Sequence, residues 1–280
     1  MVHTTTTLAA EADAPGPRKE RRGERQSRGE LRDVLLRSAR EVVEEEGIET
    51  GTSNLTFKRV FERVELETGR HVTNASVIGR IWTNQAEFQA DVLTAIARDE
   101  GRPEVDRTLR AVAGVLDRVD LGSPDSRLRA QRELCRVGGG ASSSAIADSQ
   151  NWSLWISVLT IATTHSDVEQ RDRIAIALAE GYEWVTVFWE GIYQWLLEFL
   201  GFRIRKPMTT RQFTMAVTAL GEGCSLREHV DGHLAPIVLP SGDGGEDQEW
   251  TLFGVGLDAL VRQFFEPDPT FTAPTRAGSH

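Results

Sequence analysis

Apolar residues recur at intervals of three and four along most of this chain, and no stretch alternates apolar with polar residues over the length of a strand. A repeat of this kind places apolar side chains on one face of an α-helix. We therefore expect an all-α fold. Hydrophobic residues make up 40% of the 280 residues, which is enough to form a substantial buried core.

Punctuating residues divide this pattern into separate helices. Four helices are expected in the first hundred residues. The first spans 30–46, and the second begins at an N-cap at 53 or 54 and ends at Gly69. The third begins at an N-cap at 73 or 74 and runs through 82, and the fourth spans 84–98. Six more are expected near 104–119, 124–137, 145–164, 167–200, 209–231 and 248–265. The run of Gly and Ser at 137–144 is interpreted as a flexible joint, and the polar stretch 239–248 as a mobile loop.

Charge is distributed unevenly along the chain. The formal net charge is −10, yet Pro17–Arg40 holds nine basic residues and four acids. That segment therefore carries about +5 and the rest about −15, which suits a protein that touches DNA at one end only. Residues 1–27 are expected to form a disordered basic arm, with candidate DNA contacts at Arg18, Lys19, Arg21, Arg22 and Arg25.

Several classes of protein fit poorly. The N-terminus lacks the pattern of a secretory signal, and Glu183, Glu190 and Glu198 interrupt the most apolar long segment, so no membrane span is expected. Cys135 and Cys224 lack metal or redox spacing and are expected to be buried, unpaired thiols of a cytoplasmic protein. His229 and His233 lie four residues apart beside a helix end, and we expect no metal site, no cofactor and no catalysis.

Three stretches of the first hundred residues read LRDVLLRSAREVVEEEG, LTFKRVFERV and SVIGRIWTNQAEFQADVL. Together they resemble the N-terminal signature of the TetR family of transcriptional regulators. As in that family, Thr56 opens the second helix and the aromatic Trp82 closes the third, the recognition helix. Gly79 and Gln85 replace a tyrosine and a lysine of the family, and the segment between the second and third helices is longer.

The resemblance implies a three-helix, helix-turn-helix DNA-binding domain at 28–84 and a larger helical domain for ligand binding and dimerisation at 85–270. Recognition helices insert their N-terminal residues into the major groove, where Asn suits adenine and Arg suits guanine. The candidates for base contact are Asn74, Ser76 and Arg80. The remaining DNA-binding candidates, chiefly phosphate contacts, are Thr56, Lys58, Arg59, His71, Thr73, Trp82 and Gln85.

The rest of the chain resembles the family more loosely, at 153–169 and 209–262. The family's last two helices pair with their copies to form a four-helix bundle. The resemblance therefore implies a homodimer that binds a twofold DNA operator. The interface candidates are Phe213, Val217, Leu220, Phe253, Leu257, Leu260 and Phe264.

Aromatic residues gather between residues 152 and 199, and a helix that is apolar on nearly all sides must be buried. One interpretation is an aromatic core. The other is a pocket for a small hydrophobic or aromatic ligand, oriented by polar groups such as Glu183 and Glu190. The ligand-binding candidates are Trp152, Trp155, Trp184, Phe188, Trp189 and Tyr193.

Two functions compete at this point. The favoured one is a DNA-binding regulator, most simply a repressor that a ligand releases from its operator, with the fourth helix joining the two domains. The alternative is an all-α dimeric ligand-binding or scaffold protein whose helix-turn-helix domain no longer binds DNA specifically. A small all-α enzyme is a third possibility, for which the sequence offers no motif.

Overall fold

The structure is a computed structural model that describes residues 27–46, 52, 54–98, 103–231, 235–241 and 245–273. Over these ranges the chain is mainly helical, as expected. The helices are α1 (Arg28–Glu46), α2 (Phe57–Thr68), α3 (Asn74–Val77), α4 (Gln85–Ala97), α5 (Pro103–Leu116), α6 (Pro124–Ala147), α7 (Gln150–Thr164), α8 (Val168–Leu200), α9 (Thr210–Asp231) and α10 (Leu252–Phe264). The predicted basic arm and Gly47 lie outside the described residues, apart from Ser27.

Four short strands were not anticipated. They form two antiparallel pairs, β2 (Phe202–Ile204) with β5 (Phe265–Pro267) and β3 (Ile237–Leu239) with β4 (Gln248–Trp250). Each strand has only three residues, which is too short for an alternating pattern to stand out in the sequence. The β3–β4 pair flanks the polar stretch that was expected to be a mobile loop.

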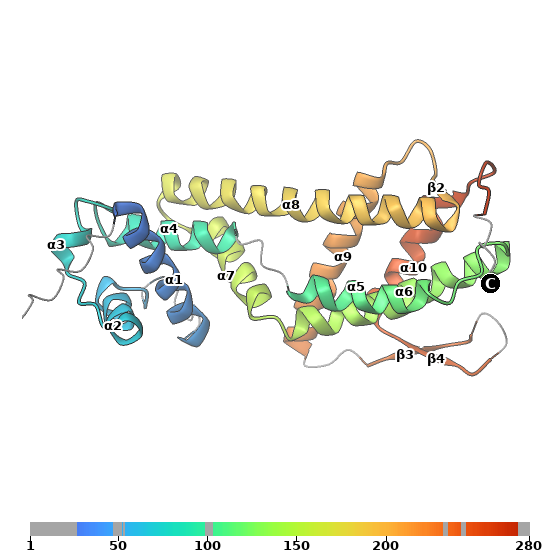
Figure 1. The fold of residues 1–280 in the computed structure, drawn as a ribbon, viewed down its shortest axis with the longest axis horizontal. Helices are drawn as coiled ribbons and strands as arrows, with labels where there is room; N and C mark the ends of the chain where they lie inside the picture. The colour runs from blue at the N-terminus through green and yellow to red at the C-terminus, as the bar shows by residue number, and fades with distance from the viewer. Residues whose placement is uncertain are drawn as a thin grey trace, which may run out of the picture.

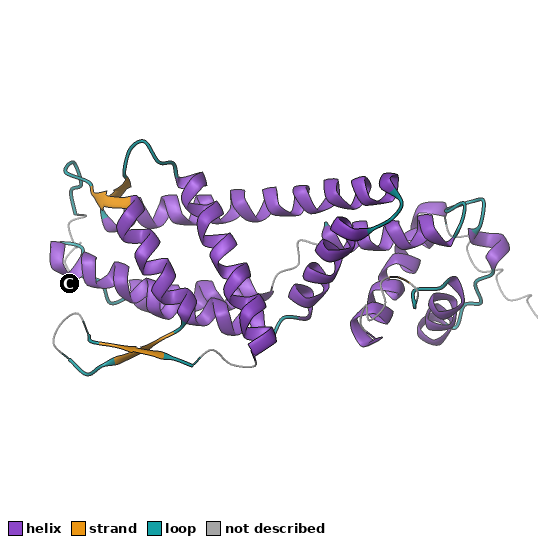
Figure 2. Ribbon diagram, turned by 180° about the vertical axis from the view of Figure 1, so that it is seen from behind, coloured by secondary structure: helices purple, strands orange, loops and turns teal. Residues whose placement is uncertain are grey.

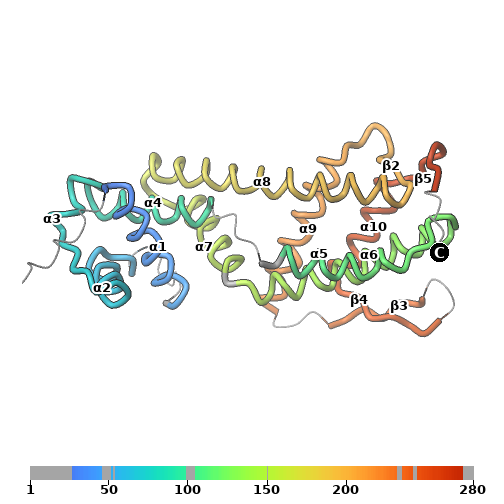
Figure 3. Tube along the Cα trace, in the orientation of Figure 1, coloured from blue at the N-terminus to red at the C-terminus, as the bar shows by residue number. Residues whose placement is uncertain are grey.

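The molecule is elongated (Figure 1). The helices α1–α4 form a head at one end, and α5, α6, α8, α9 and α10 form a body at the other. The 33-residue α8 runs from beside α4 along the length of the body. The helices α5 and α6 lie side by side below it (Figure 3), and α9 and α10 cross between these two levels on the face that Figure 2 shows.

The core of the head extends onto α7 and the first half of α8. A continuous cluster runs from Leu35 and Val60 in the head through Phe88 in α4 to Trp155 in α7 and Ile174 in α8. The predicted domain boundary between residues 84 and 85 therefore divides elements that pack together. At Gly181, an added Cβ would lie 2.6 Å from the Ala97 carbonyl oxygen and 2.8 Å from the Trp155 ring, so α4, α7 and α8 meet closely there.

The Gly and Ser run is not a joint, contrary to the sequence interpretation. It continues α6 without a break through Gly138–Gly140 to Ala147. A Cβ on Gly139 would lie only 2.7 Å from the Cα of Gly254 in α10. Glycine is therefore required by the close approach of two helices rather than by chain flexibility.

Side-chain caps define where most helices begin. Thr56 caps α2 and Asn84 caps α4, each accepting a hydrogen bond from the backbone N–H three residues on. The predicted N-cap of α2 at Ser53 or Asn54 is thus displaced to Thr56, and the predicted start of the fourth helix near Asn84 is confirmed. At the other end of α2, Gly69 adopts the left-handed conformation (φ 68°) and ends the helix.

None of the helices in the described part of the chain is both long and apolar enough to cross a membrane. Cys135 and Cys224 are buried and unpaired, as expected.

Candidate functional site

The helix α3 forms the outer tip of the head, at the end of the molecule farthest from the body (Figure 1). It is a single turn, shorter than the recognition helix expected through Trp82. The N–H of Thr73 donates to Ser76 Oγ at 3.2 Å, and the Ser76 hydroxyl donates to the Thr73 carbonyl at 2.6 Å. The helix stops because Ile78 is extended and Gly79 has a φ of 74°, which favours glycine.

Most of the predicted DNA contacts lie on the surface of this tip and of α2. The side chains at the surface are those of Lys58, Arg59, His71, Thr73, Asn74, Arg80 and Gln85, and those of Thr56 and Ser76 are partly exposed. Thr56 and Ser76 also serve as local capping groups. The arm residues Arg18, Lys19, Arg21, Arg22 and Arg25 lie outside the described residues.

Trp82 is the exception among these residues. It is only 3% exposed, with its ring packed against those of Phe57 and Phe88. Its apolar surface is used in the head core, so it is unavailable for the DNA contact that the sequence suggested. Its role is to attach the tip to α2 and α4.

The positive charge of the head is partly neutralised. Arg63 pairs with Glu41, Glu45 and Glu67, and hydrogen bonding to Glu45 is the main reason that its pKa lies above the usual value. Nearby, Lys58 Nζ is 3.9 Å from Glu62. Arg80, in contrast, has no ion pair with any residue that the structure describes. Arg80 is therefore the basic side chain best placed at the tip to meet an anion.

A buried carboxylate joins the tip to the rest of the molecule. Asp91 of α4 accepts hydrogen bonds from Arg32 Nε at 2.9 Å and Nη2 at 2.8 Å, and from Trp82 Nε1 at 2.8 Å. A nitrogen of Arg173, in the first turns of α8, lies 3.9 Å from the same carboxylate. Sequence analysis missed this cluster. The available signal was an acid within the apolar stretch of α4.

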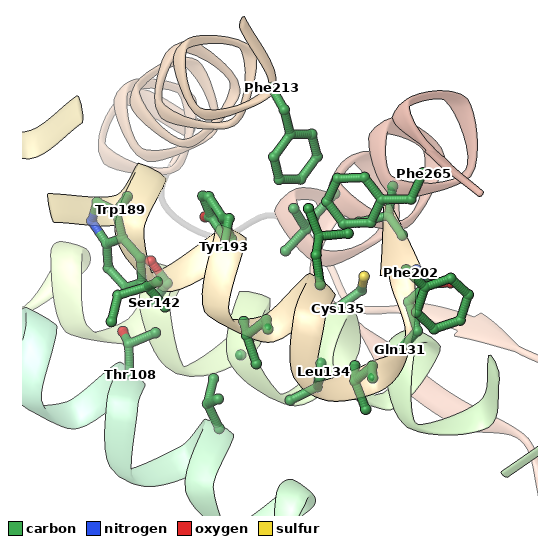
Figure 4. A pocket seen from close by; sticks show the side chains of 18 of the residues that line it. Thr108, Gln131, Leu134, Cys135, Ser142, Trp189, Tyr193, Phe202, Phe213 and Phe265 are labelled. Atoms are coloured by element: carbon green, nitrogen blue, oxygen red, sulfur yellow. The ribbon is translucent and has the colours of Figure 1, made fainter. Parts of the chain in front are cut away.

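The body contains a partly open apolar cavity of about 90 Å³ between α5, α6, α8, α9 and α10 (Figure 4). Most of its lining is aliphatic or aromatic. Its polar side chains include Thr108, Gln131 and Ser142, and the part of the chain that the structure describes contributes no Asp, Glu, Lys, Arg or His to the lining. Figure 4 places Thr108 and Ser142 near Trp189 at one end, and Gln131 near Phe202 at the other. Burial raises the pKa of both Cys135 and Tyr193, two further lining residues.

Two of the six predicted ligand contacts line this cavity, namely Trp189 and Tyr193. Trp152 and Trp155 belong instead to the core shared by the head, α4, α7 and α8. Trp184 and Phe188 stack on each other along α8, 5.6 Å apart, outside the cavity lining.

The carboxylates expected to orient a ligand lie elsewhere. Glu183 and Glu190 are both paired with Arg211 at the start of α9. The cavity therefore differs from the predicted pocket in having no charged side chain among the described residues that line it.

The proposed interface residues divide into two groups. Phe213, Val217 and Phe253 are buried within their own subunit, so they cannot also form an interface. Leu220, Leu257, Leu260 and Phe264 are partly buried against the same cluster. The outward side of α9 carries other apolar residues. These are Met215, Ala219, Leu226 and Val230.

His229 lies on α9 and His233 lies outside the described residues. Among the residues that are described, no group of three or more His, Cys, Asp or Glu side chains is arranged to hold a metal ion.

No protein-family model matches the chain, and a search of curated proteins found no significant match. The arguments for function therefore depend on the geometry above and on the residue pattern of the head.

Proposed function

We propose that this protein is a dimeric DNA-binding regulator, similar in plan to the TetR family, whose DNA affinity responds to a ligand in the body. The observation that carries the proposal is the tip of the head. There Asn74 and Arg80 are exposed beside a single helical turn, at the end of the molecule farthest from the cavity.

Each of these two side chains suits a base edge. Asn pairs with adenine and Arg with guanine through two hydrogen bonds in the major groove. Lys58 and Arg59 of α2, with Thr73 at the tip, are exposed in positions that suit phosphate contacts. The predicted arm would add positive charge, because much of the positive charge of the head is neutralised by its own acidic residues.

The proposal is tested by fluorescence anisotropy with labelled duplex from the region upstream of the protein's own gene, across a salt series. We expect the logarithm of the affinity to fall linearly with the logarithm of salt, as phosphate contacts require. Arg80→Ala should weaken binding about 5- to 150-fold, the loss of one bidentate base contact. Arg129→Ala is the control, because Arg129 is an exposed arginine on α6 in the body. Binding that ignores both salt and Arg80→Ala would contradict the proposal.

Dimerisation is proposed to use the outward face of α9. Met215, Leu226 and Val230 are exposed on it, and Ala219 and Gly223 lie between them at helical spacing. An apolar stripe of this length on a surface helix is typical of an interface. A twofold dimer would present two heads to two half-sites.

Sedimentation of two matched variants tests this interface. Leu226 on α9 is 47% exposed and Leu128 on α6 is 49% exposed. Leu226→Glu should convert dimer to monomer, whereas Leu128→Glu should leave the dimer intact. A wild-type monomer, or equal behaviour of the two variants, would contradict the assignment.

Communication between the sites is proposed to run through α8. Its first turns bring Arg173 near Asp91, which holds Trp82 and thus the tip, and its last three turns line the cavity. A ligand alters DNA affinity only if it prefers one of two arrangements of these elements.

A second candidate is a ligand-binding or scaffold protein without DNA affinity. The single-turn α3 and the neutralisation of Arg63 favour it, since both reduce what the head offers to DNA. The salt series separates the two, because the second candidate should show no salt-sensitive binding to duplex DNA.

A further inference from the structure

We infer that the body cavity takes an uncharged, slender apolar molecule with a single hydrogen-bonding group, bound with that group at Ser142. The inference deepens the proposed function by naming the class of ligand, and its test needs no DNA.

The lining excludes charge. Among the described residues that line the cavity none is acidic or basic, and their polar side-chain groups are hydroxyl, amide, thiol and indole groups. A carboxylate or ammonium placed among them would lose its hydration without gaining a partner of opposite charge. The raised pKa values of Cys135 and Tyr193 reflect the same disfavour for charge.

The shape of the lining selects a slender molecule. On α8 the lining runs from Trp189 to Leu200, and on α6 from Gln131 to Ser142. Each stretch advances eleven residues, or about 16 Å along a helix. A volume of about 90 Å³ spread between two such walls leaves a narrow space.

Polar side chains lie at both ends of this space. Ser142 lies near Trp189 at one end and Gln131 near Phe202 at the other, and Leu134, Cys135 and Tyr193 lie between them (Figure 4). The Ser142 side chain makes no hydrogen bond with another residue that the structure describes. It can therefore donate to, or accept from, one hydroxyl or carbonyl group of a ligand.

The size of the cavity links binding to movement. An engineered apolar cavity of roughly 150 Å³ accommodates benzene, and this one is smaller. A longer chain that stays wholly within the lining must push the lining helices apart, so it binds preferentially to a widened body. That preference is what a coupled change at the head requires.

The probes are 1-octanol, octanoate, octylammonium and octane, titrated into the full chain by calorimetry at pH 7. We expect 1-octanol to bind, and octanoate and octylammonium to bind about a hundredfold more weakly or not at all. Cyclooctanol, with the same carbon count in a compact ring, should bind more weakly than 1-octanol.

Two substitutions at one position test the orientation. Ser142→Ala should weaken 1-octanol binding about 3- to 10-fold, the value of one hydrogen bond, and leave octane binding unchanged. Ser142→Leu should fill that end and abolish the binding of both.

Three outcomes would overturn the inference: no binding of 1-octanol, equal binding of octanoate, or unchanged 1-octanol binding in both variants. If the wild-type protein binds 1-octanol but does not bind DNA, the proposed function alone is refuted and the inference about the ligand stands.

Discussion

The close contact between α6 and α10 gives a quantitative prediction at Gly139. An alanine there would place its Cβ 2.7 Å from the Cα of Gly254 and 3.2 Å from its backbone nitrogen. Carbon atoms pack best at about 3.5–4.0 Å, so the two helices must separate by roughly 0.8 Å or more. Overpacking of this kind costs about 1–3 kcal/mol.

The neighbouring residue supplies the control. Gly140 is on the same helix, and an added Cβ there meets nothing within 4 Å. Each Gly→Ala change gains about 1 kcal/mol of helix propensity, so that gain cancels in the comparison. Gly139→Ala should therefore be about 1–3 kcal/mol less stable than Gly140→Ala.

Thermal unfolding followed by circular dichroism at 222 nm measures this difference. One kcal/mol corresponds to about 2–4 °C in a protein of this size class, so the two midpoints should differ by roughly 2–12 °C. Equal midpoints would show that α6 and α10 can separate without a loss of stability, and the argument for a tight α6–α10 contact would fail.

Two further predictions concern the buried polar groups. Asp91→Asn should lower the free energy of unfolding in urea by about 1–3 kcal/mol, because the charge-assisted bonds from Arg32 are lost. Asp33→Asn, at an exposed carboxylate 3.8 Å from the same arginine, should cost less than about 0.5 kcal/mol; comparable losses would argue against the Asp91 cluster as a link. For Tyr193, whose pKa is raised by burial, the associated stability is present below the unfolded value of about 10 and is lost as the pH rises beyond it. The melting temperature should therefore fall less between pH 9 and 11 in Tyr193→Phe than in the wild type, and parallel curves would refute this.

The sequence was most informative where structure is decided locally. The apolar repeat predicted helices through most of the described chain, and Asn84 and Gly69 marked helix ends because a side-chain cap and a left-handed residue act within one turn. The caps at 53 or 54 failed for a similar local reason, since Thr56 competes for the same role three residues before its partner Arg59.

It was least informative where distant segments decide the outcome. The glycines of α6 look like a joint until Gly254 is placed against Gly139. The spacing of Val77, Ile78 and Trp82 is that of one face of a helix. The helix nevertheless ends at Val77, and Trp82 is buried against Phe57 and Phe88. The aromatic rings of α8 did not distinguish Trp189 and Tyr193, which line the cavity, from Trp184 and Phe188, which do not. A cavity is a gap between several helices, so it leaves no periodic signal on one of them.

The contact at Gly181 has a mechanical consequence for α8. Because the backbone of α4 and the ring of Trp155 hold the helix close at that point, a stiff helix can turn about it as about a pivot. Arg173 lies eight residues to one side, about 12 Å away, and Tyr193 twelve residues to the other, about 18 Å away. A tilt of about 3° that moves the cavity end by roughly 0.9 Å then moves Arg173 by roughly 0.6 Å in the opposite direction. Widening the cavity would thus move Arg173 relative to Asp91, in the direction opposite to the movement of the cavity end. A bulkier residue at position 181 would shift the pivot without contacting either end of this lever.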